Sequence, residues 1–342
     1  MSEFEPIARF GNLVATGLVA VSHDPRDLDT AGWWAVTQTF EGQFTAFRFE
    51  SISQATPIPA FTETVPLTTW QSSLSESQYE FAVDAVREDI ARGWVYQVNL
   101  CRVLSASLEK PINLEALYGQ LLRHNPAPHG GYLRVPEWNI DIASASPELF
   151  LSREGNVIKS SPIKGTAKIS SEMLDKDAAE NIMIVDLIRN DLSHACREGT
   201  VTVEHLLRLE EHPGLVHLVS DVVGIVDDKT SWAQILEATS PPGSVSGAPK
   251  SSALETIARL ETSPRGIYCG AFGWVDADNK KASLAVGIRT FWQTSEAHRA
   301  TLHFGTGAGI TWESDPQGEW RETVLKADRL LSITAGLVGQ IL

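Results

Sequence analysis

Several features are scarce in this sequence, and each scarcity excludes a class of protein. Three cysteines, Cys101, Cys196 and Cys269, are scattered over 342 residues without metal-binding spacing, which excludes a disulfide scaffold and fits a reducing compartment. The longest apolar stretch, Leu13–Val21, is far too short to span a bilayer. The N-terminus is acidic and lacks the basic and apolar regions of a signal peptide. The sequence therefore predicts a cytoplasmic protein that does not enter a membrane.

Basic residues are also in short supply. Lys and Arg number 28 against 43 Asp and Glu, so the formal net charge is −15 and the pI is about 5.0. A nucleic-acid-binding protein needs a basic surface, and no run of Lys or Arg occurs here, so nucleic acid is not expected as a partner. The remaining composition, 43% hydrophobic and 21% charged, is that of an ordinary globular protein long enough for one large domain.

The N-terminal 76 residues have the pattern of β-structure. Apolar and polar residues alternate over residues 34–40, Glu41-Gly42 interrupts the alternation, and a second apolar run extends from Phe44 to Phe49. Two such runs separated by a glycine-containing turn are typical of a β-hairpin.

Helices and further strands follow. A helix is predicted from Ser77, whose spacing to Glu80 matches a capping box, to Gly93, a usual helix-terminating residue. Apolar periodicity predicts three more helices, at Asn113–His124, Asp175–Cys196 and Asp315–Leu331. Strand-like runs occur at Ile140–Ala145, Glu148–Ser152 and Val157–Ile163, and a hairpin is expected from Leu284–Gln293 to Thr301–Phe304. The expected fold is α+β: a single large domain with two packed, mainly antiparallel sheets flanked by helices, in which residues 1–76 form a β-rich portion and residues 77–336 the main part.

Two of the predicted helices carry acidic pairs. Asp177 and Glu180 are three residues apart, as are Glu319 and Glu322, so each pair shares one helix face. Two facing acidic pairs would repel each other unless a cation lay between them, and Mg²⁺ prefers such oxygen ligands. The spacing alone favours two solvated helix faces, which are the usual place for acids.

Two short segments contain candidates for acid–base or nucleophilic chemistry. Glu148 lies between Pro147 and an apolar run, where desolvation would raise its pKa and make it a proton donor near neutrality. Lys164, in Pro-Ile-Lys-Gly-Thr, precedes a glycine, and a partly buried lysine can act as a nucleophile. An ordinary turn lysine with its ammonium in water would give the same motif.

Further candidates are weak one by one. The glycine-rich segment 243–250 could present amides, the Ser244 hydroxyl and the Lys250 ammonium to an anion, but it lacks the spacing of a P-loop. The Gly-Ala-Gly segment at 307–309 is another possible backbone donor. His217 and Arg289 lie in apolar, strand-like surroundings, where a structural role is the simpler interpretation.

The order of these motifs is more specific than any one of them. Together they resemble the chorismate-utilising enzymes: the large subunits of anthranilate synthase and aminodeoxychorismate synthase, and the isochorismate and salicylate synthases. The resemblance spans residues 77–336 and rests on the segments YQVNL (96–100), ASASPELFL (143–151), PIKGT (162–166), DAAENIMIVDLIRNDL (177–192), HLVSDVVG (217–224), GSVSGAPK (243–250), RGIYCGAFG (265–273), IRT (288–290) and GAGITWESDP (307–316) with ETVLKA (322–327). It implies the fold of anthranilate synthase component I and a chorismate-binding catalytic domain over 77–336.

The resemblance also implies roles for individual residues. Glu180 and Glu322 would bind Mg²⁺ directly, with Asp177 and Glu319 holding its water ligands. The enolpyruvyl carboxylate of chorismate would be bound by Tyr268, Arg289 and the amide of Gly309. Further support around the carboxylates would come from Ser244, Lys250 and Lys326. Glu148 would be the general acid for the departing ring hydroxyl, and His217 would lie near the reacting ring carbons.

Lys164 decides between branches of the family. The resemblance is closest to aminodeoxychorismate synthase component I, whose PIKGT lysine attacks C2 of chorismate before ammonia enters at C4; anthranilate synthases resemble PIAGT at this segment. It implies production of 4-amino-4-deoxychorismate for 4-aminobenzoate and folate, with ammonia supplied by a glutamine amidotransferase subunit as partner. Isochorismate or salicylate formation, anthranilate formation and non-catalytic chorismate binding remain the alternatives. No LLES-like tryptophan-binding segment occurs in this sequence, so bound tryptophan is not expected.

Overall fold

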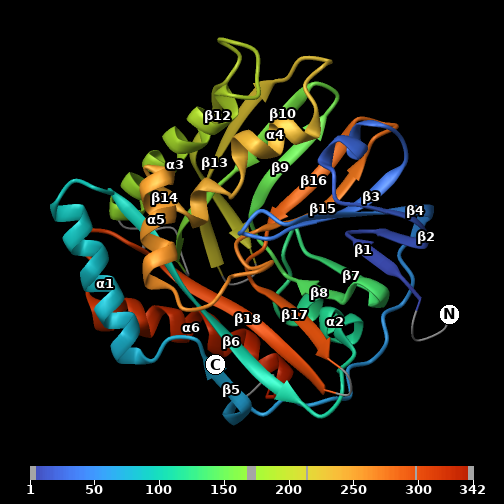
Figure 1. Cartoon of the computed structure of the whole chain (residues 1–342), viewed down its shortest axis with the longest axis horizontal. Coiled ribbons are helices and arrows are strands. Elements are labelled where there is room, and N and C mark those ends of the chain that lie inside the picture. The colour runs from blue at the N-terminus through green and yellow to red at the C-terminus, as the bar shows by residue number, and fades with distance from the viewer. Residues whose placement is uncertain (1–4, 168–174, 213–214, 297–298, 338–342) are drawn as a thin grey trace.

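The computed structural model describes residues 5–167, 175–212, 215–296 and 299–337 (Figure 1). All strand pairs in these residues are antiparallel, and pairing joins the strands into one eighteen-stranded sheet. The strands are β1 (Ile7–Phe10), β2 (Leu13–Ser22), β3 (Trp33–Gln38), β4 (Phe44–Gln54), β5 (Trp70–Ser72), β6 (Gln97–Leu108), β7 (Gly131–Val135), β8 (Ile140–Ser144), β9 (Leu149–Glu154), β10 (Val157–Ser161), β11 (Ile163–Ala167), β12 (Thr202–His212), β13 (Leu215–Ile225), β14 (Gly247–Ala248), β15 (Ala271–Asp276), β16 (Lys281–Val286), β17 (Thr290–Glu296) and β18 (Arg299–Ile310).

Helices cover the outer faces of this sheet. They are α1 (Glu76–Ala91), α2 (Leu114–His124), α3 (Asp175–Ser193), α4 (Trp232–Thr239), α5 (Lys250–Leu260) and α6 (Pro316–Thr334), with short 3-10 turns at Pro25–Asp29, Leu67–Thr69, Pro136–Trp138 and Gly243–Val245. Helix α3 packs on β11, β12 and β13, whereas α6 packs on β18 and on α1 and α2. Figure 1 shows α3 beside β12 and β13 in the upper half and α6 beside β6 and β18 in the lower half. The α+β class predicted from the sequence is confirmed.

The two expected sheets are continuous in their hydrogen bonding. Strand β1 pairs with β2 on one side and with β7 on the other, so it joins the upper and lower parts of the sheet. A core of buried aromatic and aliphatic side chains, among them Phe10, Phe47, Leu133 and Phe272, lies where these parts face each other. The predicted hairpin of residues 34–49 is present as β3 and β4, and β3 also pairs with β15. The strands described in residues 5–76 belong to the common sheet, and the division of the domain into residues 1–76 and 77–336 remains a prediction.

Helix α1 confirms one sequence signal and corrects another. Its buried stripe contains Tyr79, Val83 and Val86, as the periodicity predicts, and Gly93 adopts φ +75° just after the helix ends. The capping box, however, is formed by Ser75 and Gln78, not by the pair of Ser77 and Glu80. Both pairs have the same spacing, and the helix begins earlier because Ser75 has the extended backbone of a cap.

The predicted strand Leu284–Gln293 is also wrong in one respect. It consists of two strands, β16 and β17, which pair with different neighbours and are separated at residues 287–289. At the break, a Cβ on Gly287 would lie 2.0 Å from the carbonyl oxygen of Ile267, so only glycine allows this close backbone approach. The two acidic helices were predicted within three residues of their ends: α3 ends at Ser193 and α6 at Thr334.

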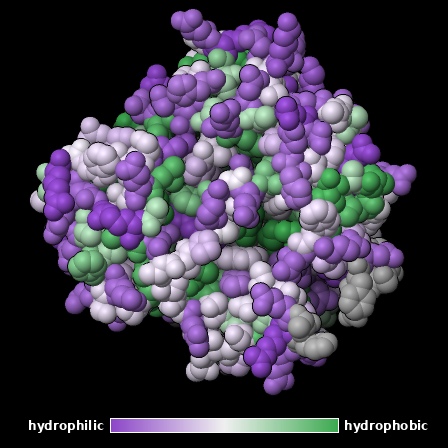
Figure 2. Space-filling view, viewed as in Figure 1, coloured by the Kyte–Doolittle hydropathy of each residue, from purple (hydrophilic) through white to green (hydrophobic). Residues whose placement is uncertain are grey.

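The surface is consistent with the acidic composition. Hydrophilic side chains cover most of the face in Figure 2, and hydrophobic ones gather in small separate areas. Within the described ranges, no helix has both the length and the apolar character needed to cross a membrane.

Candidate active site

The segment that carries Glu148 is attached to the segment that carries Arg289. The amide of Ala145 donates to the carbonyl oxygen of Arg289 (3.0 Å). The Ser146 hydroxyl donates to the carbonyl oxygen of Val286 (2.6 Å), at the end of β16. These contacts hold the turn between β8 and β9 against the break between β16 and β17. Two residues distant in sequence, Glu148 and Arg289, are thereby placed next to each other.

The Glu148 carboxyl is almost fully buried, with 4% of the residue exposed. Burial disfavours the charged form and raises its pKa to about 7, against the lowering effects of the Ser244 hydroxyl, the Lys164 ammonium, the Ile163 amide and the Arg289 guanidinium. These four groups, which lower the pKa, are the polar neighbours of the carboxyl. The structure therefore brings together Glu148, Ser244, Lys164 and Arg289, as expected from the sequence, and makes Glu148 a group that exchanges its proton near neutral pH.

Lys164 and Gly309 approach the same space from β11 and β18. A Cβ placed on Gly309 would lie 3.7 Å from Lys164 Nζ and 2.4 Å from Nε2 of Gln97. Any side chain at position 309 would therefore displace Gln97. Glycine at this position leaves the backbone amide accessible and the lysine amine close to it.

Gln97 was missed by the sequence reasoning. It is 1% exposed, and neither its amide oxygen nor its amide nitrogen has a hydrogen-bond partner within the described part of the chain. Buried amide groups are rarely left without partners, so Gln97 is a candidate for contact with a bound molecule. The only sequence signal was its place in YQVNL, a segment that has no chemical signature of its own.

Arg289 is partly buried and Tyr268 is buried, and the two side chains differ in their surroundings. Arg289 adopts φ +51°, a conformation that non-glycine residues rarely take outside functional or turn positions. Burial lowers its pKa, and Arg329 acts in the same direction while Glu148 opposes it. Tyr268 is 4% exposed with its hydroxyl 3.8 Å from Cys101 Sγ. Its ring fits because residue 305 is glycine, since a Cβ there would lie 2.0 Å from the ring.

The acidic residues of α3 lie next to Asn181, whose hydrogen bonds attach that helix to the sheet. Asp177 and Glu180 are partly buried. The following residue, Asn181, is fully buried, donates to the carbonyl oxygen of Leu218 (3.1 Å) and accepts from the Ser220 hydroxyl (2.5 Å). Asn181 thus fixes the first turns of α3 on β13, the strand that also carries His217. His217 itself is buried and is the pairing partner of Thr166 on β11, two residues from Lys164.

The acidic residues of α6 are placed by a second anchor. The Thr306 hydroxyl on β18 donates to the carbonyl oxygen of Thr323 (2.9 Å), one residue after Glu322. The Glu322 carboxylate is half-exposed and pairs with Lys326 (2.6 Å), whose ammonium also donates to the carbonyl oxygen of Gly307 (3.1 Å). Lys326 is therefore tied to the strand that presents Gly309.

Glu319, one turn earlier on α6, accepts a hydrogen bond from the Ser314 hydroxyl (2.6 Å).

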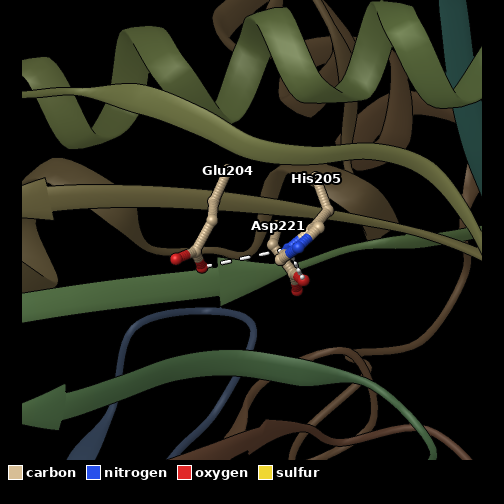
Figure 3. Close-up of side chains that lie close together, drawn as sticks. All are labelled: Glu204, His205 and Asp221. Carbon is tan, nitrogen blue, oxygen red and sulfur yellow. Dashed lines mark hydrogen bonds and ion pairs between the residues drawn. The ribbon is translucent and has the colours of Figure 1, made fainter.

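These four acids have the donor chemistry of a magnesium site. Mg²⁺ is usually held by one or two carboxylates together with waters and substrate oxygens, so it does not require a cluster of three side chains. Among the described residues, the only group of three ligand atoms within 4.8 Å of one another is Glu204, His205 and Asp221, on β12 and β13 (Figure 3).

That group is unsuited to a metal. Lys159 Nζ lies 3.1 Å and Arg208 Nη2 3.4 Å from the Asp221 carboxylate, and the Ser161 hydroxyl donates to it at 2.6 Å. Burial acts to raise the pKa of Asp221, but these donors outweigh it and lower the pKa. Two protein cations already neutralise the position that a metal ion would take.

Lys250 occupies a different position from the cluster around Glu148. Its ammonium lies 2.6 Å from Asp191 Oδ2 and 3.1 Å from the carbonyl oxygen of Thr239. It thereby ties the end of α3 to the loop after α4, which leads to Ser244. Asp191 was not singled out from the sequence, although its place in RNDL next to an apolar helix is the same buried-acid signal as that of Glu180.

A hollow of about 880 Å³ lies elsewhere, between the β3–β4 turn, α4 and α5, and none of the predicted site residues lines it. Two of its charged residues, Glu261 and Arg265, are already paired with each other (2.7 Å). Arg265 also donates to the carbonyl oxygens of Val245 and Asn99, and so braces the loop and strand that carry Ser244 and Gln97. This hollow has large volume but lacks the convergent polar groups of the Glu148 site.

Comparisons with known proteins identify related sequences. Residues 16–332 match the model of the chorismate binding enzyme family. The chain is 35% identical over 300 residues to anthranilate synthase component 1 of Streptomyces coelicolor, covering 84% of this chain and 56% of that protein. It is 33% identical over 288 residues to aminodeoxychorismate synthase component 1 of Bacillus subtilis, covering 80% and 59%. The chain thus spans somewhat more than half the length of these curated relatives.

Solved structures share the fold. Anthranilate synthase component I of Streptococcus pneumoniae superposes with a TM-score of 0.78 at 23% identity, covering 94% of this chain and 92% of that one. The menaquinone-specific isochorismate synthase of Escherichia coli superposes with a TM-score of 0.79 at 18% identity, covering 97% and 89%. With its motifs, its fold and the match over most of its length, this chain belongs to the chorismate binding enzyme family.

Proposed function

We propose that the protein converts chorismate and ammonia into 4-amino-4-deoxychorismate, the reaction of an aminodeoxychorismate synthase component I. The observation that carries this proposal is the placement of a lysine amine and a protonatable carboxyl in one site. Lys164 acts on the buried Glu148 and lies close to Gly309. In the anthranilate synthases that the sequence resembles, alanine takes the place of this lysine, so the lysine favours the amino product at C4.

The carboxylates of chorismate require cations in an otherwise acidic protein. We assign the enolpyruvyl carboxylate to Arg289, the Gly309 amide and Tyr268, with Ser244 and Lys326 nearby. We assign the ring carboxylate to Mg²⁺ bound by Glu180 and Glu322, with Asp177 and Glu319 behind them. When bound, the ion supplies positive charge that neutralises the ring carboxylate against these acids. Lys250, held by Asp191, supports the loop from outside this set.

The chemical steps follow from these positions. The neutral amine of Lys164 attacks C2, the ring double bond shifts, and the C4–O bond breaks while Glu148 donates its proton to the departing hydroxyl, which leaves as water. Ammonia then attacks C4, the double bond shifts back, and the C2–N bond to Lys164 breaks. The net change is replacement of the hydroxyl by an ammonium group with release of water, and the added proton is the one that Glu148 supplies. His217 lines the ring side, and Gln97 offers an amide to the incoming ammonia or to the ring.

The ammonia source is assigned to a separate glutamine amidotransferase subunit. The motifs resemble those of large subunits, and relatives bear the names anthranilate synthase component 1 and aminodeoxychorismate synthase component 1. Ammonium salts should replace the partner in vitro.

The test combines product identification with a search for the covalent intermediate. The protein is incubated with chorismate, Mg²⁺ and ammonium, and the product's ring substitution is determined by mass spectrometry and NMR. Without ammonium, wild type should form an adduct on the peptide that contains Lys164, and Lys164→Ala should form none. Anthranilate as product, or a 4-amino product formed undiminished by Lys164→Ala, would contradict the proposal. Isochorismate or salicylate would assign the chain to the water-using branch instead.

A further inference from the structure

A second buried carboxyl, that of Asp191, lines the same small cavity as Glu148. Asp191, in the last turn of α3, is 6% exposed. A small cavity of about 10 Å³ is lined by both carboxyl-bearing residues, Glu148 and Asp191. The hydroxyl-bearing residues Ser160, Ser244 and Thr239 also line it. A volume of this size accommodates about one water molecule, and the lining offers the two to four polar partners that a buried water needs.

The loop between the two carboxyls keeps them at short range. Gly243 and Ser244 are consecutive: the Ser244 hydroxyl hydrogen-bonds to Glu148, and a Cβ on Gly243 would lie 3.4 Å from Asp191 Oδ2. The same hypothetical Cβ would lie 2.9 Å from a methyl group of Leu187, so position 243 has no room for a side chain. Glycine therefore lets the loop pass closely between Asp191 and Glu148.

The charged groups around the two carboxyls differ. Lys164 and Arg289 face Glu148, whereas Lys250 and His194 face Asp191. The Lys250 side chain is 17% exposed and so connects the Asp191 end of this arrangement with the solvent. Burial raises the pKa of Asp191 to about 6, opposed by Lys250, and that of Glu148 to about 7. Proton transfer between groups with such similar pKa values is efficient in both directions.

Glu148 loses its proton in every turnover under the proposed function, and this inference rests on that function. The face of Glu148 toward Lys164 and Arg289 is the one that bound substrate would cover. We propose that Asp191 returns the proton to Glu148 through one water molecule in the cavity, with Lys250 as its counter-ion. The water gives a proton to the Glu148 carboxylate and takes one from the Asp191 carboxylic acid. Asp191 is then reprotonated from solvent at the Lys250 edge, so no net charge accumulates.

The kinetic test uses Asp191→Asn, which preserves shape, and Asp191→Ala, which leaves space for a small acid. Both should lower kcat about tenfold or more with less than a twofold change in KM for chorismate. Asp186→Asn, on the same helix but with a side chain 79% exposed, is the matched control and should behave as wild type.

Formate and nitrate distinguish proton transfer from charge pairing. Both are small planar anions that can pair with Lys250 in Asp191→Ala, but only formate is basic enough to take up a proton and pass it on. Formate should restore kcat in a saturable manner and nitrate should not. Equal rescue by both anions, or a kcat within twofold of wild type in Asp191→Asn, overturns the proposal.

A titration without turnover separates this inference from the proposed function. The infrared band of the protonated Glu148 carboxyl, identified by its loss in Glu148→Gln, is followed against pH. In Asp191→Asn the positive charge of Lys250 is no longer compensated, so the Glu148 midpoint should fall by half a pH unit or more; in Asp186→Asn it should not move. An unchanged midpoint in Asp191→Asn overturns the coupling. Failure of wild type to convert chorismate would instead refute the proposed function.

Discussion

Glu148 and Asp221 are two buried carboxyl groups whose pKa values are shifted in opposite directions. Glu148 lies among groups that only partly offset its burial, and its pKa rises to about 7. Asp221 is just as buried, but Lys159, Arg208 and the Ser161 hydroxyl hold its pKa below the usual value. The first carboxyl can exchange a proton at neutral pH, and the second stays ionised there. The difference shows that burial alone does not identify a catalytic acid, because the partners decide the charge.

Figure 3 illustrates why the distinction matters for metal sites as well. Glu204, His205 and Asp221 point toward one another and meet a geometric criterion for metal binding. Lys159 and Arg208 already neutralise the negative charge of this group. The acids of α3 and α6 form no such compact group, yet they are placed on two helices that are separately anchored to the strands of the site. Close clustering of possible ligand atoms therefore marks the ion-pair network around Asp221 and not the proposed Mg²⁺ site on α3 and α6.

The largest expected effect is on catalysis. Glu148→Gln removes the proton donor while keeping the shape, so kcat should fall at least about 100-fold, the usual contribution of a general acid. Asp221→Asn should leave kcat within about twofold, because Asp221 belongs to the other network. Both are measured as chorismate consumption at saturating Mg²⁺ and ammonium. Equal losses in the two variants would remove the functional distinction between the carboxyls.

The next effect concerns the metal. Glu322→Gln and Glu180→Gln should each lower turnover at least about tenfold at low Mg²⁺, since each removes one of two proposed direct ligands. Glu204→Gln is the control from the ion-pair network and should leave the Mg²⁺ dependence unchanged. Full activity of Glu322→Gln at low Mg²⁺ rules out its assignment as a ligand.

Much of the fold was predictable from local patterns. The periodicity of α1 and the Asp315-Pro316 start of α6 are properties of short segments, and the structure confirms them. The continuity of the sheet through β1 was not predictable, because it depends on pairing between residues more than one hundred positions apart. The break at Gly287 also depends on a distant contact, with the backbone of Ile267.

The candidate site was likewise predictable only where local motifs carry the signal. Glu148, Lys164, Ser244 and Arg289 were identified by motif order, and the structure brings them together. Gln97 and Asp191 were missed, since their significance depends on buried amide atoms without partners and on a cavity shared with Glu148. Lys250 shows the converse: its motif predicted a substrate contact, whereas its ammonium pairs with Asp191.

The pH dependence of catalysis should separate the two carboxyls further. Glu148 must be protonated to act, so kcat should decline as the pH rises above about 7, the pKa set mainly by its burial. Because the pKa of Asp221 is lowered, Asp221 stays ionised through this range, and Asp221→Asn should keep the same declining limb. Rate profiles of the two enzymes between pH 5.5 and about 9 test this. A limb that disappears in Asp221→Asn would contradict it.

The smallest expected effect is on stability without substrate or metal, and its sign differs between the two carboxyls. The folded-state pKa of Glu148, about 7, exceeds the reference value of 4.5. Between pH 4.5 and about 7, the Glu148 carboxyl is largely ionised in the unfolded chain but still protonated in the folded protein. Wild type should therefore lose roughly 3 kcal/mol of stability as the pH rises from 4.5 to 7, and Glu148→Gln should avoid this loss.

For Asp221 the pKa is lowered, so its contribution is present above the unfolded value of 3.8 and is lost as the pH falls through the folded value. Glu148→Gln should thus be more stable than wild type at pH 8 and similar near pH 4. Asp221→Asn should be less stable than wild type at pH 8, with the gap narrowing in acid. Urea unfolding at both pH values measures these differences. If both variants shift stability in the same direction at pH 8, the two carboxyls do not have the opposite charge balance that their neighbours indicate.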